Sequence, residues 1–410
     1  RNGKSSLIAH DPGCGKTEPI LHYLNKNKYT KSLIIAPACI RNQWTEDIDK
    51  LELNAEFISF ETGSRLGKRP TKLLKKTWKR IVIDEAHKLG IGISQLSRFC
   101  LNLKSKIVIC ITGTPVVKHK RDMITLAKCL KYDNIEQLVE EGMLYESKDD
   151  VLNLPPLRIN IHNLTNSEFI KHHKKAIVSL DISGTMKELI SKRMASLHPG
   201  LVSGCRYVPV LTKIELLNRL VSSTLNNTII FTNYLKENRY ITKYLLNNNN
   251  TKHKIFSITG EVKSNIRDEI FNIAKAGKRN NSNILYHLHT IIPGLCAPIL
   301  LNIKQYLVHP ILVVMQQQIG GVGLNLQAFD TIYFPNPSYC PASDFQALCR
   351  SYRLGQNKPV TVHFMYANKE VKRFIDNRVC QLRNKKLKTI KNITKIDLFK
   401  HENVNIINHN

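Results

Sequence analysis

Short apolar runs rich in β-branched residues recur along the chain, each separated from the next by a longer segment of mixed polarity. Such runs are typical of strands buried on both faces, and strands that alternate with helical segments form parallel sheets covered by helices. The runs form two series: SLIIAP (32–37), EFISF (56–60), IVIDE (81–85) and KIVICIT (106–112), then TIIFTN (228–233), KIFSIT (254–259), ILVVM (311–315), TIYF (331–334) and VTVHFM (360–365). The pattern predicts an α/β fold of two lobes, each built on a parallel sheet.

The stretch between the two series carries few strand signals. It begins at Pro155 and Pro156, where proline disfavours a helix, and residues 167–180 and 186–197 then show helical periodicity. We therefore expect a first lobe at 1–153, a mostly helical connector at 154–205, a second lobe at 206–383 and a basic peripheral tail at 384–410. The chain opens on Arg1 rather than Met, and we expect that it lacks its natural N-terminus.

The charge balance indicates a polyanionic partner. Lysine and arginine outnumber aspartate and glutamate 61 to 32, so the formal net charge is +29. An excess of this size is typical of proteins that bind nucleic acid, an anionic membrane or an acidic protein. The most apolar stretch, 284–315, is broken by Pro293, Pro298 and Pro310, so it does not form one membrane-spanning helix. We expect no membrane role.

The cysteines are spread singly along the chain. None of the ten forms a Cys-x-x-Cys pair, so neither a zinc ribbon nor a redox pair is indicated. Several stand inside apolar runs, as Cys110 does, where a reduced thiol packs like a small hydrophobic group. This usage is typical of a reducing, intracellular compartment, and we expect no structural metal.

A glycine-rich loop stands near the start of the chain, ahead of a segment that can form a helix. It reads His10-Asp11-Pro12-Gly13-Cys14-Gly15-Lys16-Thr17. Loops of this type turn their backbone N–H groups inward around a phosphate, and Gly13 and Gly15 permit that backbone on either side of Cys14. Lys16 would reach the β- and γ-phosphates of a nucleotide, and the Thr17 hydroxyl would ligate Mg²⁺.

Two further motifs stand at strand ends of the first lobe. Asp84 and Glu85 close the run IVIDE, which places two carboxylates at the carboxyl edge of a parallel sheet, where ligands bind in such folds. Asp84 would hold Mg²⁺ through water, and Glu85 would orient the attacking water. Thr112 and Thr114, in the turn after the next run, are small hydroxyl groups that would link the nucleotide site to the cleft between the lobes.

The second lobe carries a glycine-rich loop and a pair of arginines. Gly320, Gly321 and Gly323 follow the run ILVVM and permit close approach of a phosphate or a nucleic-acid strand. Arg350 and Arg353 are three residues apart, so on a helix they share one face. Such a pair would neutralise charge on a γ-phosphate, as arginine fingers do, or would form an ordinary basic helix face.

In this order, the motifs resemble those of the Swi/Snf-type branch of superfamily-two helicase-like ATPases, including those of large DNA viruses. The resemblance covers residues 8–385, and the Arg-x-Gly-Gln ending at 353–356 separates this branch from relatives that end in Arg-x-Gly-Arg. Branch-specific similarity extends over IIAPACIRNQWTEDIDK (34–50), LPPLRINIHNLTNSE (154–168), RMASLHPGLV (193–202), ITGEVKSNIRDEI (258–270), GGVGLNLQAFDTIYF (320–334) and QALCRSYRLGQNKPVTVHF (346–364).

The resemblance implies two RecA-like lobes that use ATP and Mg²⁺, with Glu85, Arg350 and Arg353 as the catalytic residues. It implies that nucleotide and metal are held by Gly13, Cys14, Gly15, Lys16, Thr17, Asp84 and Gln346, with Thr17 and Asp84 on the Mg²⁺ side. Nucleic-acid contacts are expected at Asn42, Trp44, Thr112, Gly113, Thr232, Gly260, Gly321, Gly323 and Asn325. A nuclear location or, for a viral protein, the host cytoplasm or virion is expected.

The function that follows is a DNA-dependent ATPase that translocates on duplex DNA and remodels protein–DNA complexes, with DNA-bound proteins as further partners. One alternative is a strand-separating helicase or a viral transcription-associated ATPase. Another is a non-hydrolysing nucleic-acid-binding module, if the extra residues at 284–310 disrupt the second lobe. At the residue level, Trp44 either stacks on a base or packs the core, and the basic run 68–80 either lines a nucleic-acid groove or is a solvated face.

Overall fold

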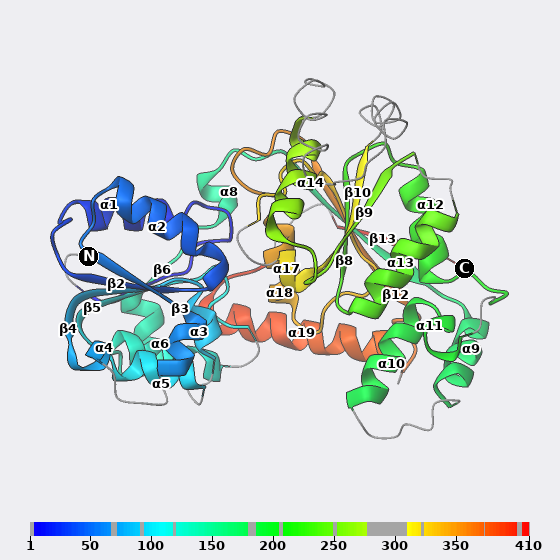
Figure 1. Ribbon diagram of the computed structural model, residues 1–410. Helices are drawn as coiled ribbons and strands as arrows, with labels where there is room; N and C mark the ends of the chain where they lie inside the picture. The colour runs from blue at the N-terminus through cyan, green and yellow to red at the C-terminus, as the bar shows by residue number, and fades with distance from the viewer. Residues whose placement is uncertain are drawn as a thin grey trace. The chain divides into compact units, whose positions relative to one another are not determined.

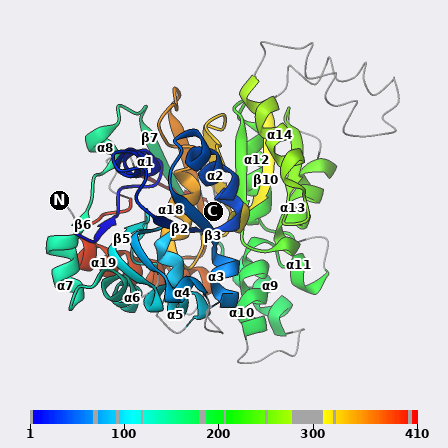
Figure 2. The same cartoon turned by 60° about the vertical axis from the view of Figure 1, so that its left-hand side comes forward.

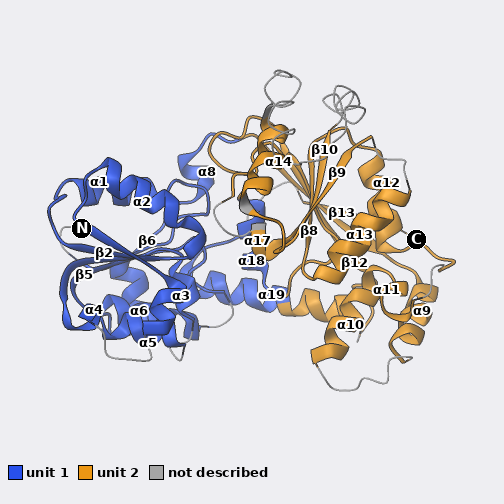
Figure 3. Cartoon of the chain, viewed as in Figure 1, with its two compact units in different colours: residues 1–154, 340–349, 383–400 blue, residues 155–339, 350–382, 401–410 orange. Residues whose placement is uncertain are grey.

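A computed structural model describes most of the chain and divides it into two compact units (Figure 3). The described residues are 4–66, 72–90, 94–117, 120–178, 186–204, 208–248, 252–276, 310–320, 324–372, 374–399 and 404–409. Unit 1 comprises residues 1–154, 340–349 and 383–400, and unit 2 comprises residues 155–339, 350–382 and 401–410. The extra segment at 284–310, apart from its last residue, lies outside the described residues.

Unit 1 is built on a six-stranded sheet in which every neighbouring pair is parallel. Its order is β3-β2-β4-β5-β1-β6. The strands are β1 (Ser6–Ile8), β2 (Ser32–Ala36), β3 (Ala55–Ser59), β4 (Thr77–Ile83), β5 (Lys104–Ile111) and β6 (Met143–Leu144). Because all strands run the same way, the loops that follow their carboxyl ends gather at one edge of the sheet.

Helices cover both faces of the first sheet, with α1 and α2 on one face and α3, α5 and α6 on the other (Figures 1 and 2). The helices of unit 1 are α1 (Thr17–Asn25), α2 (Arg41–Lys50), α3 (Phe60–Leu66), α4 (Lys72–Lys75), α5 (Gln95–Asn102), α6 (Arg121–Leu130), α7 (Ile135–Gln137), α8 (Lys148–Val151) and α18 (Pro341–Leu348), with short 3-10 turns at Ala38–Ile40 and Ala86–Leu89 and a π turn at Leu138–Gly142. Leu24, Trp44, Ile34 and Val82 belong to the buried cluster between the sheet and α1 and α2.

Unit 2 is built on a seven-stranded sheet, again parallel throughout, with the order β13-β7-β12-β11-β8-β10-β9. The strands are β7 (Leu157–Leu164), β8 (Thr228–Thr232), β9 (Lys254–Ile258), β10 (Ile311–Gln316), β11 (Thr331–Phe334), β12 (Val360–Ala367) and β13 (Val404–His409). The helices are α9 (Ser167–Val178), α10 (Met186–Leu197), α11 (Gly200–Ser203), α12 (Lys213–Ser222), α13 (Leu235–Asn247), α14 (Ser264–Ala276) and α17 (Gln317–Gly320). Two parallel sheets covered by helices confirm the predicted fold class.

The connector and the tail contribute more to the second sheet than we expected. Residues 157–164 of the expected connector form β7, and residues 404–409 of the expected peripheral tail form β13, which pairs with β7 at the sheet edge. Strand β7 carries His and Asn at buried positions, and β13 is exposed along most of its length, so neither shows the apolar pattern of a buried strand. Helix α19 (Ile375–Thr394) contributes to both units. Among the described residues, no helix is both long and apolar enough to span a bilayer.

Candidate active site

The glycine-rich loop joins β1 to the start of α1. Gly13 and Gly15 have φ angles of 91° and 67°, a left-handed conformation that glycine adopts without strain. Lys16 caps α1, and its Nζ donates to the backbone carbonyl of Asp11, 3.1 Å away. The loop therefore leads directly into the N-terminal end of a helix, where free N–H groups and the helix dipole favour an anion.

Asp11 fastens the loop to the segment that follows β6. Its Oδ2 accepts a hydrogen bond of 3.0 Å from the backbone N–H of Lys148, and its own N–H donates to the carbonyl of Glu146 at 3.3 Å. The carboxylate is buried, and burial raises its pKa although the nearby Lys148 and Lys16 act in the opposite direction. The loop is thus held to the segment after β6 by two hydrogen bonds that its own sequence does not reveal.

Asp84 follows the end of β4 at the same sheet edge. Its Oδ2 accepts a hydrogen bond of 3.1 Å from the indole Nε1–H of Trp44, and its Oδ1 accepts one of 2.8 Å from the backbone N–H of Glu85. Burial and the neighbouring charge of Glu85 raise the pKa of Asp84 to about 6, although Trp44 and Lys16 favour the ionised form. The nearby hydrogen bonds and Lys16 do not fully offset the cost of burying this negative charge, so a bound cation would stabilise it.

Glu85 begins a chain of contacts that runs along the sheet edge. Its backbone is left-handed, with φ of 49°, and its Oε2 lies 3.3 Å from Nδ1 of His87. The same nitrogen lies 3.0 Å from the Thr112 hydroxyl, which also accepts from the backbone N–H of Thr114 at 3.2 Å. Gln346 of α18 donates from Nε2 to the Thr114 hydroxyl. The structure thereby brings two strand-end motifs and Gln346 together within unit 1.

The residues expected to hold a magnesium ion carry the oxygen groups that this ion binds. Asp84 supplies a buried carboxylate, and burial together with the charge of Glu85 raises its pKa. Thr17 supplies a half-buried hydroxyl at the first residue of α1. Oxygen ligands of this kind are those that Mg²⁺ prefers, usually together with water and phosphate oxygens.

Several residues expected to contact nucleic acid are buried instead. Trp44 is 1% exposed and packs between α2 and the sheet, so the core-packing alternative describes it and the base-stacking one is wrong for this structure. Thr112 and Thr232 are fully buried, and the Thr232 hydroxyl donates to the carbonyl of Met315 at 3.3 Å. A Cβ on Gly113 would meet the Pro12 ring. These residues are therefore packed inside their own units.

Other expected contacts lie at the surface or outside the described residues. Asn42, Gly260 and Asn325 are exposed, and the Gly260 N–H donates to the Gln316 side chain at 3.2 Å. Gly321 and Gly323 lie outside the described residues.

The two arginines do not share a helix face as we predicted. Helix α18 ends at Leu348, and Arg350 and Arg353 lie in the turn that follows it, in unit 2. The carbonyl of Arg350 accepts from the N–H of Leu326 at 3.1 Å, which ties this turn to the segment after the glycine-rich loop of unit 2. The prediction was wrong because spacing of three residues indicates a shared face only when the helix continues.

Sequence reasoning missed His87, Asp11 and Lys148. His87 stands two residues after Glu85, so its position next to the acidic pair was a usable signal. Asp11 lies inside the glycine-rich loop, but its partner Lys148 is far along the chain. Only the pairing of β1 with β6 brings that partner near, and no local pattern indicates it.

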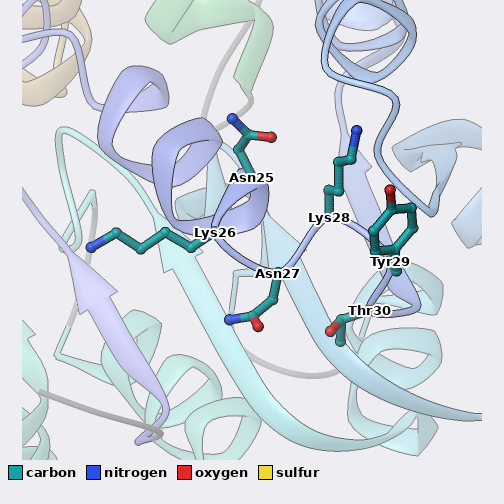
Figure 4. A pocket seen from close by; sticks show the side chains of 6 residues that line it. All are labelled: Asn25, Lys26, Asn27, Lys28, Tyr29 and Thr30. Atoms are coloured by element: carbon teal, nitrogen blue, oxygen red, sulfur yellow. The ribbon is translucent and has the colours of Figure 1, made fainter.

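A surface hollow lies at the other end of α1 from the loop (Figure 4). Its lining consists of Asn25, Lys26, Asn27, Lys28, Tyr29 and Thr30. Since α1 runs from Thr17 to Asn25, this hollow is separated from Lys16 by the length of the helix. It is therefore not part of the candidate nucleotide site.

Two units built on parallel sheets have the architecture expected from the motifs. A model of the SNF2-related domain matches residues 51–140. A probable global transactivator from Orgyia pseudotsugata multicapsid polyhedrosis virus is 21% identical over 89% of this chain and 82% of its own length. The ISWI chromatin-remodeling complex ATPase ISW1 of Saccharomyces cerevisiae is 22% identical over 93% of this chain and 38% of its own length. The chain is thus similar in sequence to Swi/Snf-type ATPases, the resemblance that its motifs predicted.

The chain corresponds to much less than two thirds of the chromatin-remodelling relative. Among solved structures, it is similar to the ATP-dependent Type ISP restriction-modification enzyme LlaBIII bound to DNA, with a TM-score of 0.54 and 13% identity. That likeness covers 100% of this chain and 30% of the other, and it concerns the fold alone.

Proposed function

We propose that the chain is a DNA-dependent ATPase that couples ATP hydrolysis to translocation on duplex DNA and to remodelling of protein–DNA complexes. The observation that carries the proposal is the position of Asp84 and Glu85 at the carboxyl edge of the first sheet. There the charge of Lys16 acts on Asp84, and His87 links Glu85 to the turn after β5. The similarity to a chromatin-remodelling ATPase supports ATP hydrolysis as the proposed reaction.

In this proposal the residues of unit 1 divide the work on the nucleotide. The N–H groups around Gly13, Cys14 and Gly15 bind phosphate oxygens, and Lys16 exchanges its carbonyl partner for the β- and γ-phosphates. Asp84 and Thr17 would hold Mg²⁺, which neutralises phosphate charge when it is bound.

Glu85 is the proposed general base that orients the attacking water. His87 lies against the Glu85 carboxylate and the Thr112 hydroxyl, so it is suited to hold that carboxylate in place. Gln346 reaches the same network through Thr114. The roles of Arg350 and Arg353 remain a proposal from the motif, for substitution to test.

DNA as the partner is proposed from the charge and from the relatives. The net charge of +29 favours a polyanion, and the structural neighbour LlaBIII is bound to DNA. Asn42, Gly260 and Asn325 are the described candidates that are exposed enough to touch it.

The test is phosphate release by the full chain with and without duplex DNA. Turnover should rise with duplex and fall steeply with salt, because each phosphate contact contributes about 0.9 to the log–log slope. Lys16→Ala should lose nucleotide binding, whereas Glu85→Gln should retain binding and lose turnover. Glu140→Gln, at an exposed position outside the motifs, is the matched control.

The outcomes separate the candidate functions. Turnover that no nucleic acid changes would contradict DNA dependence. Stronger stimulation by single strands than by duplex would favour a strand-separating helicase. Tight DNA binding without any phosphate release would favour a non-hydrolysing module.

A further inference from the structure

The edge of the first sheet where its strands begin carries a row of lysines. The register pairs Ser32 of β2 with Arg80 of β4, and the N–H of Lys79 donates to the carbonyl of Lys31 at 3.3 Å. Between β4 and β5, the pairs Trp78–Ser105 and Arg80–Ile107 place Lys79 opposite Lys106. Lys31, which directly precedes β2, is therefore a neighbour of Lys79 on β4, and Lys79 is a neighbour of Lys106 on β5.

The three lysines of this row are exposed, and the Nζ of Lys31 also lies 5.3 Å from the centroid of the Trp78 ring. Along the start of β4, Thr77 and Lys79 are exposed while Trp78 and Arg80 are buried. This alternation is typical of a strand with one solvent-exposed face and one buried face. On β5 the same alternation exposes Lys104 and leaves Ser105 buried. Lys104 therefore adds a second cation on the same strand and the same face as Lys106.

An exposed aromatic residue stands next to the row. Tyr29 is 81% exposed and precedes Lys31 in the loop that lines the hollow of Figure 4. That loop is held firmly, because the buried guanidinium of Arg80 donates to the carbonyls of Asn27 at 2.9 Å and Thr30 at 3.1 Å. We call Tyr29, Lys31, Lys79, Lys104 and Lys106 the strand-start surface.

Few acidic groups offset this charge. In the described part of unit 1, the ion pairs at this edge join Lys28 to Glu52 and Lys76 to Glu56. The lysines of the strand-start surface belong to neither pair. Like charges directly opposite on neighbouring strands destabilise a sheet, so the row has an unfavourable self-energy that a polyanion would relieve.

The spacing of the row suits a nucleic-acid backbone. Neighbouring strands lie about 4.8 Å apart, so three strands span roughly 10 Å. Over that length a DNA duplex carries about six phosphates, at one charge per roughly 1.7 Å of axis. A row of cations beside an exposed aromatic ring is the combination by which proteins follow a backbone without reading its sequence.

We propose that the strand-start surface binds the phosphate backbone of nucleic acid at a site separate from the ATPase motifs. Asp84 follows β4 and Thr112 follows β5, so the motifs stand at the opposite ends of the strands that begin with these lysines. The surface therefore contributes affinity and leaves the chemistry of the nucleotide site untouched.

The experiment compares two triple variants of the full chain with equal net charge. Lys31→Gln, Lys79→Gln and Lys106→Gln remove the row, and Lys171→Gln, Lys174→Gln and Lys175→Gln remove three exposed charges from α9. Fluorescence anisotropy of a labelled DNA duplex is measured against salt, without nucleotide. The row variant should lose up to about 2.7 from the log–log slope, at roughly 0.9 for each contact, and the α9 variant should lose less.

A conservative variant guards against a folding artefact. Lys31→Arg, Lys79→Arg and Lys106→Arg keep the charge, so they should keep the slope, and turnover without DNA should match the wild type in every variant. Repeating the comparison in a Lys16→Ala background tests the surface apart from the proposed ATPase, because the loss of slope should persist without turnover.

The proposal is overturned if the row and α9 variants have the same salt slope. It is also overturned if the row variant loses binding to a poly-glutamate peptide but none to DNA, which would assign the surface to an acidic protein.

Discussion

The motif identifies Asp84, but the pKa of its carboxyl group also depends on Trp44, which is far away in the sequence. Its carboxylate receives the indole N–H of Trp44, forty positions earlier, and lies beside the charge of Glu85. Two hydrogen bonds do not offset burial next to a second carboxylate, so the pKa is raised to about 6. The residue is therefore in a costly ionised state at neutral pH until a cation arrives.

Replacement of Asp84 by Asn should stabilise the nucleotide-free protein in a pH-dependent way. The pKa of the carboxyl rises from 3.8 to about 6 on folding, so the folded state binds its proton more tightly and loses stability as the pH rises through that window. Well above pH 6 the penalty is complete, and Asp84→Asn should gain on the order of 3 kcal/mol at pH 8 and much less at pH 4.

Urea denaturation of both proteins at the two pH values, without Mg²⁺, measures this difference. Asp133→Asn at an exposed loop position is the control. An equal gain at pH 4 and pH 8 would show that ionisation of Asp84 is not its cause.

At the scale of elements, the turn after β5 supports the glycine-rich loop. Gly113 lies against Pro12, and a Cβ at position 113 would come within 2.5 Å of the proline Cγ and 2.8 Å of its Cδ. Gly15, by contrast, has open space around it and needs glycine only for its positive φ. Position 113 therefore requires glycine because of close packing, and position 15 requires it because of its backbone angle.

Gly113→Ala should destabilise the protein more than Gly15→Ala does. The proline ring and the loop must move to admit the new methyl group, a form of overpacking that costs about 1–3 kcal/mol. The left-handed backbone at Gly15 costs an alanine roughly 1 kcal/mol. Thermal melts without nucleotide compare the two, and a smaller loss for Gly113→Ala would rule out close packing of the turn on the loop.

At the scale of the whole molecule, α19 contributes to both units and is anchored in each by buried charge. In unit 2, the Asp376 carboxylate pairs with Arg193 at 3.2 Å and Lys213 at 2.8 Å, and all three side chains are almost inaccessible. In unit 1, Arg383 pairs with Asp344 of α18. Burial alone would raise the pKa of Asp376, but Lys213 and Arg193 outweigh it and hold the pKa below its usual value.

Asp376→Asn should be severely destabilising, because it leaves two buried cations short of a carboxylate. Removing one partner of a buried ion pair costs about 3–5 kcal/mol. Calorimetry of the full chain measures the loss, with Glu370→Gln at an exposed position as the control. A loss below about 1 kcal/mol would mean that the cluster does not anchor α19.

The strands predicted from the sequence all appear within the described residues, because continuous β-branched runs have no stable alternative to burial. The strands that were missed are of two kinds. Strands β1 and β6 are too short to show a period, and β7 and β13 carry polar groups such as His162 and Asn405. These segments become strands because they pair with neighbouring strands of the sheet, and their local sequence pattern does not indicate it.

By itself, the sequence determined the two parallel sheets and the local geometry of the glycine-rich loop and the acidic strand end. Those features depend on residues adjacent in the chain, whose polarity and backbone freedom act locally. Only the tertiary structure decided that Trp44 supports Asp84, that Lys148 holds the loop and that Lys31, Lys79 and Lys106 form one row. Such contacts follow from strand order and burial, which arise when the whole sheet assembles.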